Sequence, residues 1–203
     1  MRTLVIETAT GACSVALIEH GAVIAHAHEE VGRGHAERLI PMIAALPDKG
    51  RAAEILVDCG PGSFTGVRVG LAAARALGLA WGAEVRGYSS LALIAAGADW
   101  NDIDTLAVAI DGGHGQLFVQ RFAKEPMKPL SDLASLIPDD AARLVSDDRV
   151  VGNAAATLVG ARGRGQAIAA GLDAARVVDL PASLRALAAV PIYGRAPDAK
   201  PMA

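Results

Sequence analysis

Aromatic residues are scarce in this chain of 203 residues, of which they make up 3%. The formal net charge is -3, so the sequence has no excess of basic side chains either. Proteins that hold RNA by themselves usually combine a basic face with aromatic side chains on which bases stack. The composition therefore predicts that this chain does not bind RNA directly.

Cysteine is almost missing, because Cys13 and Cys59 are the only two in the sequence. They lie far apart, and each falls within an apolar segment that is expected to be a strand. Isolated cysteines of this kind are usually buried thiols rather than a disulfide or a metal pair. We predict two free cysteines in the core.

Long apolar runs are also missing, although apolar residues make up 52% of the chain. The most apolar stretch, residues 67–83, contains Arg68 and Arg75 and falls short of the roughly 20 residues that a membrane span requires. The N-terminus leads into a strand without a basic and apolar leader, so no secretory signal is expected. We predict a cytoplasmic protein with a substantial core and no membrane partner.

None of the five histidines lies four residues from another. The chain therefore lacks the His-x-x-x-His pair that places two imidazoles on one face of a helix, and a metallopeptidase built on such a pair is disfavoured. His26 and His28 would share one face of a strand, but the sequence places no third ligand beside them. We predict no metal site.

The apolar periodicity predicts two passes of a mixed α/β pattern. In the first pass we expect strands at residues 3–7, 13–18, 22–29 and 54–59, and helices at 34–46 and 67–81. In the second, weaker pass we expect strands at 103–110, 116–122, 149–151 and 176–180, and a loop with a short helix at 126–148. We place a boundary near Tyr88, which divides the chain into lobes at residues 1–87 and 88–203. The boundary leaves open that the C-terminal tail folds back onto the first lobe.

A glycine-dense loop joins the strand expected at 54–59 to the helix expected at 67–81. Its residues are Gly60, Pro61, Gly62, Ser63, Phe64, Thr65 and Gly66. A P-loop is excluded, because Val67 and Arg68 follow the last glycine in place of Lys and Ser or Thr. A dinucleotide fingerprint and a nucleophile elbow are excluded as well, since Thr65 stands where each requires glycine. Two interpretations stay open, an anion-binding loop and a tight strand-to-helix turn.

The segments GPGSFTGVR at residues 60–68 and LVIETAT at residues 4–10 resemble motifs of the TsaB family of bacterial tRNA threonylcarbamoyladenosine biosynthesis proteins. Further similarity lies in CSVAL at 13–17, GHAERLIP at 34–41 and PIYGRAPDAK at 191–200. The resemblance is dense over residues 1–96 and thin from there to the tail. It implies a two-lobed, actin-like (ribonuclease H-like) α/β fold of the actin, Hsp70 and sugar-kinase superfamily. The first lobe would hold a mixed five-stranded sheet with helices, and the second would be reduced.

The resemblance also implies a function, that of a non-catalytic subunit with no catalytic residue of its own. In this family's pathway, TsaD transfers the threonylcarbamoyl group from its adenylate to the adenosine beside the anticodon, in tRNAs that read codons beginning with A. The chain would support TsaD, and the ATPase TsaE would join the pair. tRNA would be bound only through the complex. Without TsaD the chain could be a homodimer or a monomer, and the sequence leaves both open.

In the superfamily, an acid followed by small hydroxyl residues binds phosphate and positions hydrated magnesium. The residues that match this pattern are Glu7, Thr8 and Thr10, with Asp111 in the second lobe. Glu7 stands where the family more usually has Asp, and glycines follow Asp111 where the family has charged residues. We expect no intrinsic cofactor, with ATP or ADP and magnesium confined to an interface in the complex. Two alternatives are a small-molecule kinase or ATPase that uses the Glu7 loop, and a purely structural role for Glu7 and Thr8 in the hairpin.

A stripe of small residues runs along the helix expected at 67–81, at Gly70, Ala74, Gly78 and Gly82. Such a stripe allows close approach of a second helix or of the chain's own sheet. By the resemblance, this helix and the helix that starts near His35 dock TsaD or a second copy of the chain. The predicted interface residues are His35, Leu39, Met42, Arg68, Gly70, Ala74, Arg75 and Gly78.

Overall fold

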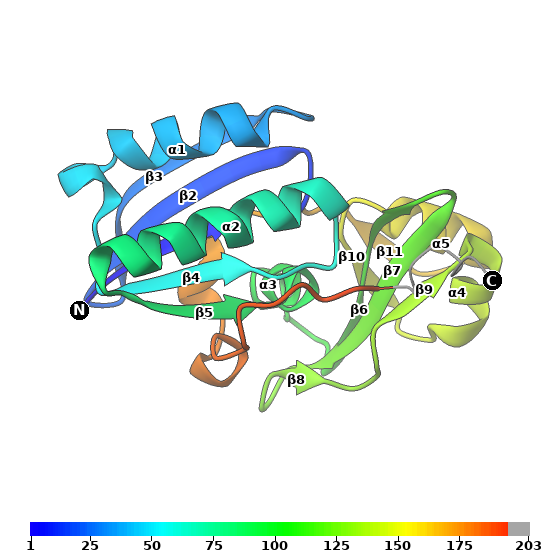
Figure 1. Cartoon of the computed structure of the whole chain (residues 1–203). Helices are drawn as coiled ribbons and strands as arrows, with labels where there is room; N and C mark the ends of the chain where they lie inside the picture. Colours follow the sequence, from blue (N-terminus) through cyan, green and yellow to red (C-terminus); the bar gives the residue numbers. More distant parts are fainter. Residues whose placement is uncertain (195–203) are drawn as a thin grey trace, which may run out of the picture.

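The computed structural model describes residues 1–194 and contains two mixed sheets (Figure 1). A large hydrophobic core takes residues from both sheets, and a smaller apolar cluster belongs to the second sheet. The first sheet has the strand order β3-β2-β1-β4-β5. Its strands are β1 (Arg2–Glu7), β2 (Ala12–Glu19), β3 (Ala22–Glu30), β4 (Glu54–Asp58) and β5 (Glu84–Tyr88). Neighbours among β1, β2 and β3 are antiparallel, whereas β4 runs parallel to β1 and β5 runs parallel to β4.

Helices α1 (His35–Ala45) and α2 (Phe64–Trp81) lie over one face of the first sheet (Figure 1). The chain therefore passes through three strands, a helix, a strand and a helix, and the predicted order is confirmed. The prediction succeeds because β1 and β2 are apolar runs buried on both faces, while the apolar residues of α1 recur at helical spacing. β5 follows α2 at a place where the periodicity predicted no strand.

The second sheet has the order β11-β10-β6-β7-β8, with β9 beside β7. Its strands are β6 (Thr105–Gly113), β7 (Gln116–Ala123), β8 (Lys128–Pro129), β9 (Ala134–Leu136), β10 (Arg149–Val151) and β11 (Gln166–Ile168). The remaining α-helices in the described chain are α3 (Ser90–Ala96), α4 (Pro138–Leu144) and α5 (Ala155–Arg162). The strands predicted at 103–110, 116–122 and 149–151 correspond to β6, β7 and β10. The division of the chain into lobes at residues 1–87 and 88–203 stays a prediction.

The strand predicted at residues 176–180 is wrong, because this segment forms the 3-10 helix η2 (Ala174–Asp179). Two shorter 3-10 helices are η1 (Pro47–Gly50) and η3 (Ala182–Leu184). The buried residues Ala174, Val177 and Leu180 recur every third residue, which is the period of a 3-10 helix rather than of a strand. η2 packs against β1, β2 and β3.

The segment after η3 returns to the first sheet and runs beside its edge strand β5 (Figure 1). Gly87 and Leu187 exchange two backbone hydrogen bonds of 2.7 and 3.0 Å, and the Ile192 amide donates to the Cys59 carbonyl over 2.7 Å. This pairing covers an edge that would otherwise expose unpaired backbone groups. The part of the tail motif from residue 195 onward lies outside the described residues.

Both cysteines are buried and free, as predicted. Burial raises the pKa of Cys13 to about 11 and that of Cys59 to about 12, so neither thiol ionises readily. Within residues 1–194, no helix has the length and apolar character that a membrane crossing needs.

The small-residue stripe of α2 faces the chain's own first sheet, so the predicted partner contact through Gly70, Ala74 and Gly78 is wrong. A Cβ atom added at Gly70 would meet the Thr8 hydroxyl, and one added at Gly78 would meet the Val85 side chain. The helix period identifies which side chains share a face, but small residues suit close approach to a sheet as well as to a partner helix.

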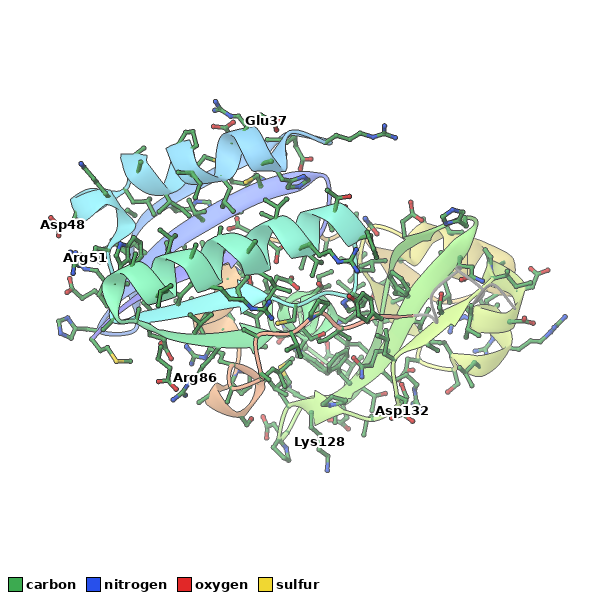
Figure 2. All side chains as sticks on the ribbon, in the orientation of Figure 1. Glu37, Asp48, Arg51, Arg86, Lys128 and Asp132 are labelled. Carbon is green, nitrogen blue, oxygen red and sulfur yellow. The ribbon has the colours of Figure 1, made fainter. Side chains whose placement is uncertain are left out.

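The interface residues predicted on α1 are buried in the same way. His35, Leu39 and Met42 are each at most 4% exposed, and the His35 Nε2 lies 3.1 Å from the Ala12 carbonyl. A partner could reach them only by displacing the first sheet, so this part of the interface prediction is wrong. Figure 2 shows the opposite side of α1, where Glu37 points away from the sheet.

Gly78→Leu is therefore expected to destabilise the fold by about 1 to 3 kcal/mol, because the added side chain would overpack the contact with Val85. Urea unfolding of the purified variant measures this loss. Ala76→Leu is the matched control, since it introduces the same leucine side chain at an exposed position of the same helix and should leave stability nearly unchanged. An unchanged midpoint for Gly78→Leu would contradict the inward orientation of the stripe.

Candidate functional site

A cavity of about 680 Å³ lies between the two sheets. One wall comes from the loop after β1 and from the glycine loop before α2, and the other comes from the turn between β6 and β7. The segment at residues 191–194 closes a third side. Of the predicted nucleotide-binding residues, Thr10 and Asp111 line this cavity from opposite walls. Their role as nucleotide ligands stays a prediction.

The glycine loop forms its wall by packing backbone against backbone. A Cβ atom at Gly62 would collide with the Ala9 carbonyl, and one at Gly66 would collide with the Thr8 carbonyl. Hydrogen bonds fix this approach, since the Ser63 amide donates to the Ala9 carbonyl over 2.7 Å and the Thr8 hydroxyl donates to the Gly66 carbonyl over 2.8 Å. The glycines are thus required for a tight turn that locks onto the loop after β1.

The side chains of the glycine loop have separate tasks. The Ser63 hydroxyl caps α2 by accepting from the Gly66 amide over 3.2 Å. Phe64 is 64% exposed, and the Arg68 guanidinium stacks on its ring at 3.3 Å from the centroid. Arg68 also donates to the Tyr193 hydroxyl over 2.9 Å. This group borders the cavity and ties the start of α2 to the C-terminal segment.

Arg68 and Arg75, which were predicted in the partner interface, are both exposed on α2. Arg75 donates to the Ala189 carbonyl over 2.7 Å, so both guanidinium groups hold the C-terminal segment. Their role toward a partner stays a prediction.

Asp111 is held in place by its own turn. Its Oδ1 accepts from the Gly113 amide over 2.8 Å, and its backbone amide donates to the Asn153 side-chain oxygen over 2.9 Å. Gly113 has a φ of +72°, which favours glycine and allows the chain to reverse here. Among the described residues that line the cavity, Asp111 is the one carboxylate.

Glu7 and Thr8 do not line the cavity, and their predicted role in binding nucleotide is wrong for this arrangement. Glu7 is 0% exposed, and its carboxyl accepts hydrogen bonds from the Ala9 amide (2.7 Å) and the Tyr88 hydroxyl (3.3 Å). Thr8 is 1% exposed and is bonded to the glycine loop. Both side chains therefore secure the hairpin, which was the structural alternative.

Glu7 shares its buried site with a second carboxyl group, that of Asp58 at the end of β4. Asp58 Oδ1 accepts from the Gly60 amide (2.5 Å) and from the Ser90 hydroxyl (2.8 Å). Burial, and then the neighbouring Asp58, raise the pKa of Glu7 well above its ordinary value. Burial also raises the pKa of Asp58, although its hydrogen bonds from Glu7, Gly60 and Ser90 act in the opposite direction. Because the pKa of Glu7 is raised by the neighbouring Asp58 as well as by burial, Glu7 is the member of the pair that we expect to keep its proton and to act as donor toward Asp58.

The carboxyl pair belongs to a polar row that crosses the whole first sheet. Its members lie side by side on the five adjacent strands. Glu7 and Asp58 are neighbours because each comes directly after one residue of the pair Ile6 and Val57. The row consists of His28, Ser14, Glu7, Asp58 and Tyr88. α2 packs on Ile6 and Val57, so the row lies on the opposite face of the sheet. Sequence reasoning missed Asp58 and Tyr88, although an acid that ends an apolar strand is a usable signal.

Ser14, His26 and Asp173 meet beside this row. His26 Nε2 lies 2.8 Å from Asp173 Oδ1 and 3.4 Å from Ser14 Oγ. A Ser-His-Asp triad needs the serine and the acid on different ring nitrogens, whereas here both lie at the same one. The Ser14 hydroxyl instead accepts from the Ala174 amide over 3.1 Å, which fixes the start of η2. The group has a structural geometry and lacks that of a hydrolase.

Comparisons of the sequence with family models and with known proteins point to related families of tRNA threonylcarbamoyladenosine biosynthesis. Residues 24–149 match the family model described as TsaD, tRNA N6-adenosine threonylcarbamoyltransferase. The chain is 39% identical over 134 residues to the tRNA threonylcarbamoyladenosine biosynthesis protein TsaB of Escherichia coli K12. This alignment covers 62% of the chain and 56% of the relative, so the chain matches about half the length of that protein.

Solved structures show the same similarity. YeaZ from Pseudomonas aeruginosa superimposes with a TM-score of 0.78 and 27% identity, over 95% of this chain and 100% of that chain. The ethanolamine utilization protein EutJ from Carboxydothermus hydrogenoformans superimposes with a TM-score of 0.50 and 12% identity, over 91% and 89% of the two chains. The second likeness is one of fold alone. The predicted actin-like α/β fold is confirmed.

Proposed function

The chain belongs to the TsaB family, and on this premise we propose that it supports TsaD as a non-catalytic subunit in the threonylcarbamoyl modification of tRNA. TsaD would transfer the threonylcarbamoyl group to the adenosine beside the anticodon, and TsaE would join the pair. The net charge of -3 supports tRNA binding through the complex rather than by this chain. The complex would act in the cytoplasm.

The non-catalytic role rests on the position of Glu7. An acid that positions magnesium must face the bound nucleotide, but Glu7 is fully buried and hydrogen-bonded to Ala9 and Tyr88. The cavity offers Asp111 as its carboxylate, and that side chain already caps its own turn. These residues do not fit a magnesium site, which favours a supporting role over kinase or ATPase activity.

Nucleotide binding without turnover is a separate part of the proposal. The cavity has the size of a small-molecule site and offers Thr10, Asp111 and the Arg68 guanidinium to a ligand. It lies between the sheets and is open, so a partner could complete it. We propose that ATP or ADP binds there only when TsaD is present.

The surface that we propose for docking TsaD is the outer face of α1 and α2, opposite the buried stripe. Leu79 is 88% exposed and Ile40 is 50% exposed, which is unusual for large apolar side chains on neighbouring helices. Exposed alanines lie on the same two helices, at positions Ala36, Ala44, Ala72 and Ala76, together with charged side chains such as Glu37 and Arg75. Small neighbours let a partner helix approach and bury the two large side chains. A second copy of the chain would compete for the same face.

Leu79→Asp is expected to weaken binding to TsaD from the same organism by at least about 30-fold, because a central apolar contact is replaced by an unpaired charge. Binding is measured by calorimetry, and tRNA modification by the TsaD–TsaE mixture should fall with it. The chain alone should modify no tRNA. Its melting temperature should be unchanged by the substitution, since Leu79 touches little of the chain's own core.

Lys128→Glu is the control, because it adds a negative charge at an exposed position far from α1 and α2 (Figure 2). It should bind TsaD like the wild type. Wild-type affinity of Leu79→Asp would exclude the outer face as the docking surface. A wild-type chain that neither binds TsaD nor stimulates tRNA modification would refute the proposed function itself.

A further inference from the structure

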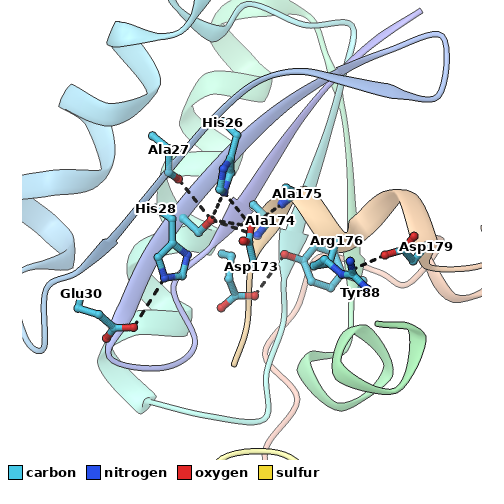
Figure 3. Close-up of polar contacts among 12 residues, drawn as sticks. His26, Ala27, His28, Glu30, Tyr88, Asp173, Ala174, Ala175, Arg176 and Asp179 are labelled. Carbon is cyan, nitrogen blue, oxygen red and sulfur yellow. Dashed lines mark hydrogen bonds and ion pairs between the residues drawn. The ribbon is translucent and has the colours of Figure 1, made fainter. Parts of the chain in front are cut away.

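Three side chains with metal-binding atoms converge on the face of the first sheet that carries the polar row (Figure 3). His26 and His28 project from the same side of β3, two residues apart, and Asp173 comes from the residue before η2. One ligand atom from each lies within 4.8 Å of the others. The prediction of no metal site assumed that no third ligand was available, and Asp173 removes that assumption.

Asp173 is fixed in this position by the backbone around it. Its Oδ1 accepts from the Ala175 amide over 2.8 Å and so caps η2. The Ala174 amide donates to Ser14 of β2 over 3.1 Å, which holds the start of η2 against the sheet. His26 and His28 lie in the regular part of the β2–β3 pairing, opposite Ala16 and Ser14, so the two imidazoles are carried by a well-supported strand. Backbone support of this kind reduces the cost of ordering ligands around a metal.

The chemistry of the three ligands selects a class of metal. Imidazole nitrogens favour zinc and its neighbours in the first transition row, whereas magnesium and calcium favour oxygen ligands. Tetrahedral zinc with bonds of about 2.0–2.2 Å holds its ligand atoms about 3.4 Å apart. His26 and Asp173 are closer than this, at 2.8 Å, and His28 lies farther away. Small rotations of partly exposed side chains would equalise these separations.

The cluster is open to solvent, as a site that exchanges metal must be. The side chains of His26, His28 and Asp173 are each about a third exposed. A fourth position would therefore be filled by water or by Glu30, whose Oε1 lies 3.7 Å from the His28 Nε2.

We propose that His26, His28 and Asp173 form a site for one divalent transition-metal ion of the zinc class. The metal clamps the start of η2 to β3, an edge strand of the first sheet. The site thus joins the C-terminal part of the chain to its first hairpin. It lies apart from the cavity and from the outer face of α1 and α2, so it is independent of the proposed function.

A simple ion pair between His26 and Asp173 is the competing explanation of the same geometry. His28 distinguishes the metal site from the ion pair, because its Nε2 lies 3.7 Å from Glu30 Oε1 and it makes no bond to Asp173. Loss of His28 should leave the ion pair intact but remove one of three metal ligands. Asp173→Asn adds a second test, since asparagine retains the oxygen that caps η2 while losing the negative charge.

The experiment is a calorimetric titration of the untagged full chain with Zn²⁺ after treatment with EDTA and dialysis into metal-free buffer. We expect saturable binding of one zinc ion per chain and a rise in melting temperature with added zinc. His28→Ala and Asp173→Asn should each weaken zinc binding by at least about tenfold, while melting like the wild type in EDTA. Mg²⁺ should give no saturable binding at this site.

His20→Asn is the matched control, because it removes an exposed histidine from the turn between β2 and β3, outside the cluster. It should bind zinc like the wild type. The proposal is overturned if the wild-type chain shows no saturable zinc binding. It is equally overturned if both cluster variants bind zinc as tightly as the wild type, or if His20→Asn loses as much affinity as they do.

Discussion

Gly66→Ala is expected to lower the free energy of unfolding by more than about 3 kcal/mol or to prevent folding altogether. The added methyl group would occupy the place of the Thr8 carbonyl oxygen, which is a backbone atom of the loop after β1. The Thr8 hydroxyl bonds the Gly66 carbonyl and the Ser63 amide bonds the Ala9 carbonyl. Neither backbone can retreat without breaking these hydrogen bonds, so the collision is not relieved by a side-chain rotation.

Thermal melting and urea unfolding measure this effect. For a chain of this length, 3 kcal/mol corresponds to a fall in melting temperature of about 6 to 12 °C. Gly160→Ala is the matched control, because Gly160 also lies in a helix and a Cβ atom there would meet nothing within 4 Å. That substitution should stabilise the protein by about 0.4 to 1 kcal/mol. A Gly66→Ala variant that melts with the wild type would show that the glycine loop is not packed as described.

The wild-type free energy of unfolding is expected to fall as the pH rises above about 4.3, which is the ordinary pKa of glutamate. The unfolded chain releases the Glu7 proton near that pH, whereas the folded chain retains it because burial raises the pKa of Glu7. Between the two pKa values the folded state binds one more proton, which gives a slope of about -1.4 kcal/mol per pH unit. The contribution is complete below the ordinary pKa and is lost as the pH rises through the raised one.

Glu7→Gln should remove this slope, because glutamine keeps a donor for Asp58 and an acceptor for Ala9 but has no proton to lose. Urea unfolding at pH values from about 5 to about 8 should show the variant overtaking the wild type, by at least about 2 kcal/mol at the upper end. Glu37→Gln is the control, because Glu37 is exposed on α1 and its loss should leave the slope unchanged. A Glu7→Gln variant with the wild-type slope would mean that the pair does not hold an extra proton.

Much of the first sheet could be predicted because its signals are local. The apolar runs of β1 and β2 and the helical spacing in α1 each lie within a dozen residues and agree with their final burial. A strand was predicted where η2 lies. Apolar residues at every third position are rare, and over a short window they resemble an irregular strand. α3 was missed, since seven residues of almost uniform hydrophobicity show no period that separates helix from strand.

The candidate sites were harder to predict because they depend on contacts between distant parts of the chain. The sequence identified Thr10 and Asp111, which do meet at one cavity. It could not show that Glu7 points to the opposite face from α2, since that depends on the pairing of β1 with β4. Asp173 reaches His26 only through the packing of η2 on the first sheet, which no local pattern encodes.

The polar row across the first sheet also limits which alternative pairings the chain can adopt while it folds. Side chains alternate between the two faces of a strand, so a slip of β1 by one residue would turn Glu7 toward α2. There it would meet Gly70 and Val57 in place of Tyr88 and Asp58, with no donor to receive it. A sheet with shifted register would thus bury an unpaired carboxyl group, which is energetically costly. The polar row therefore favours the native register of the five strands.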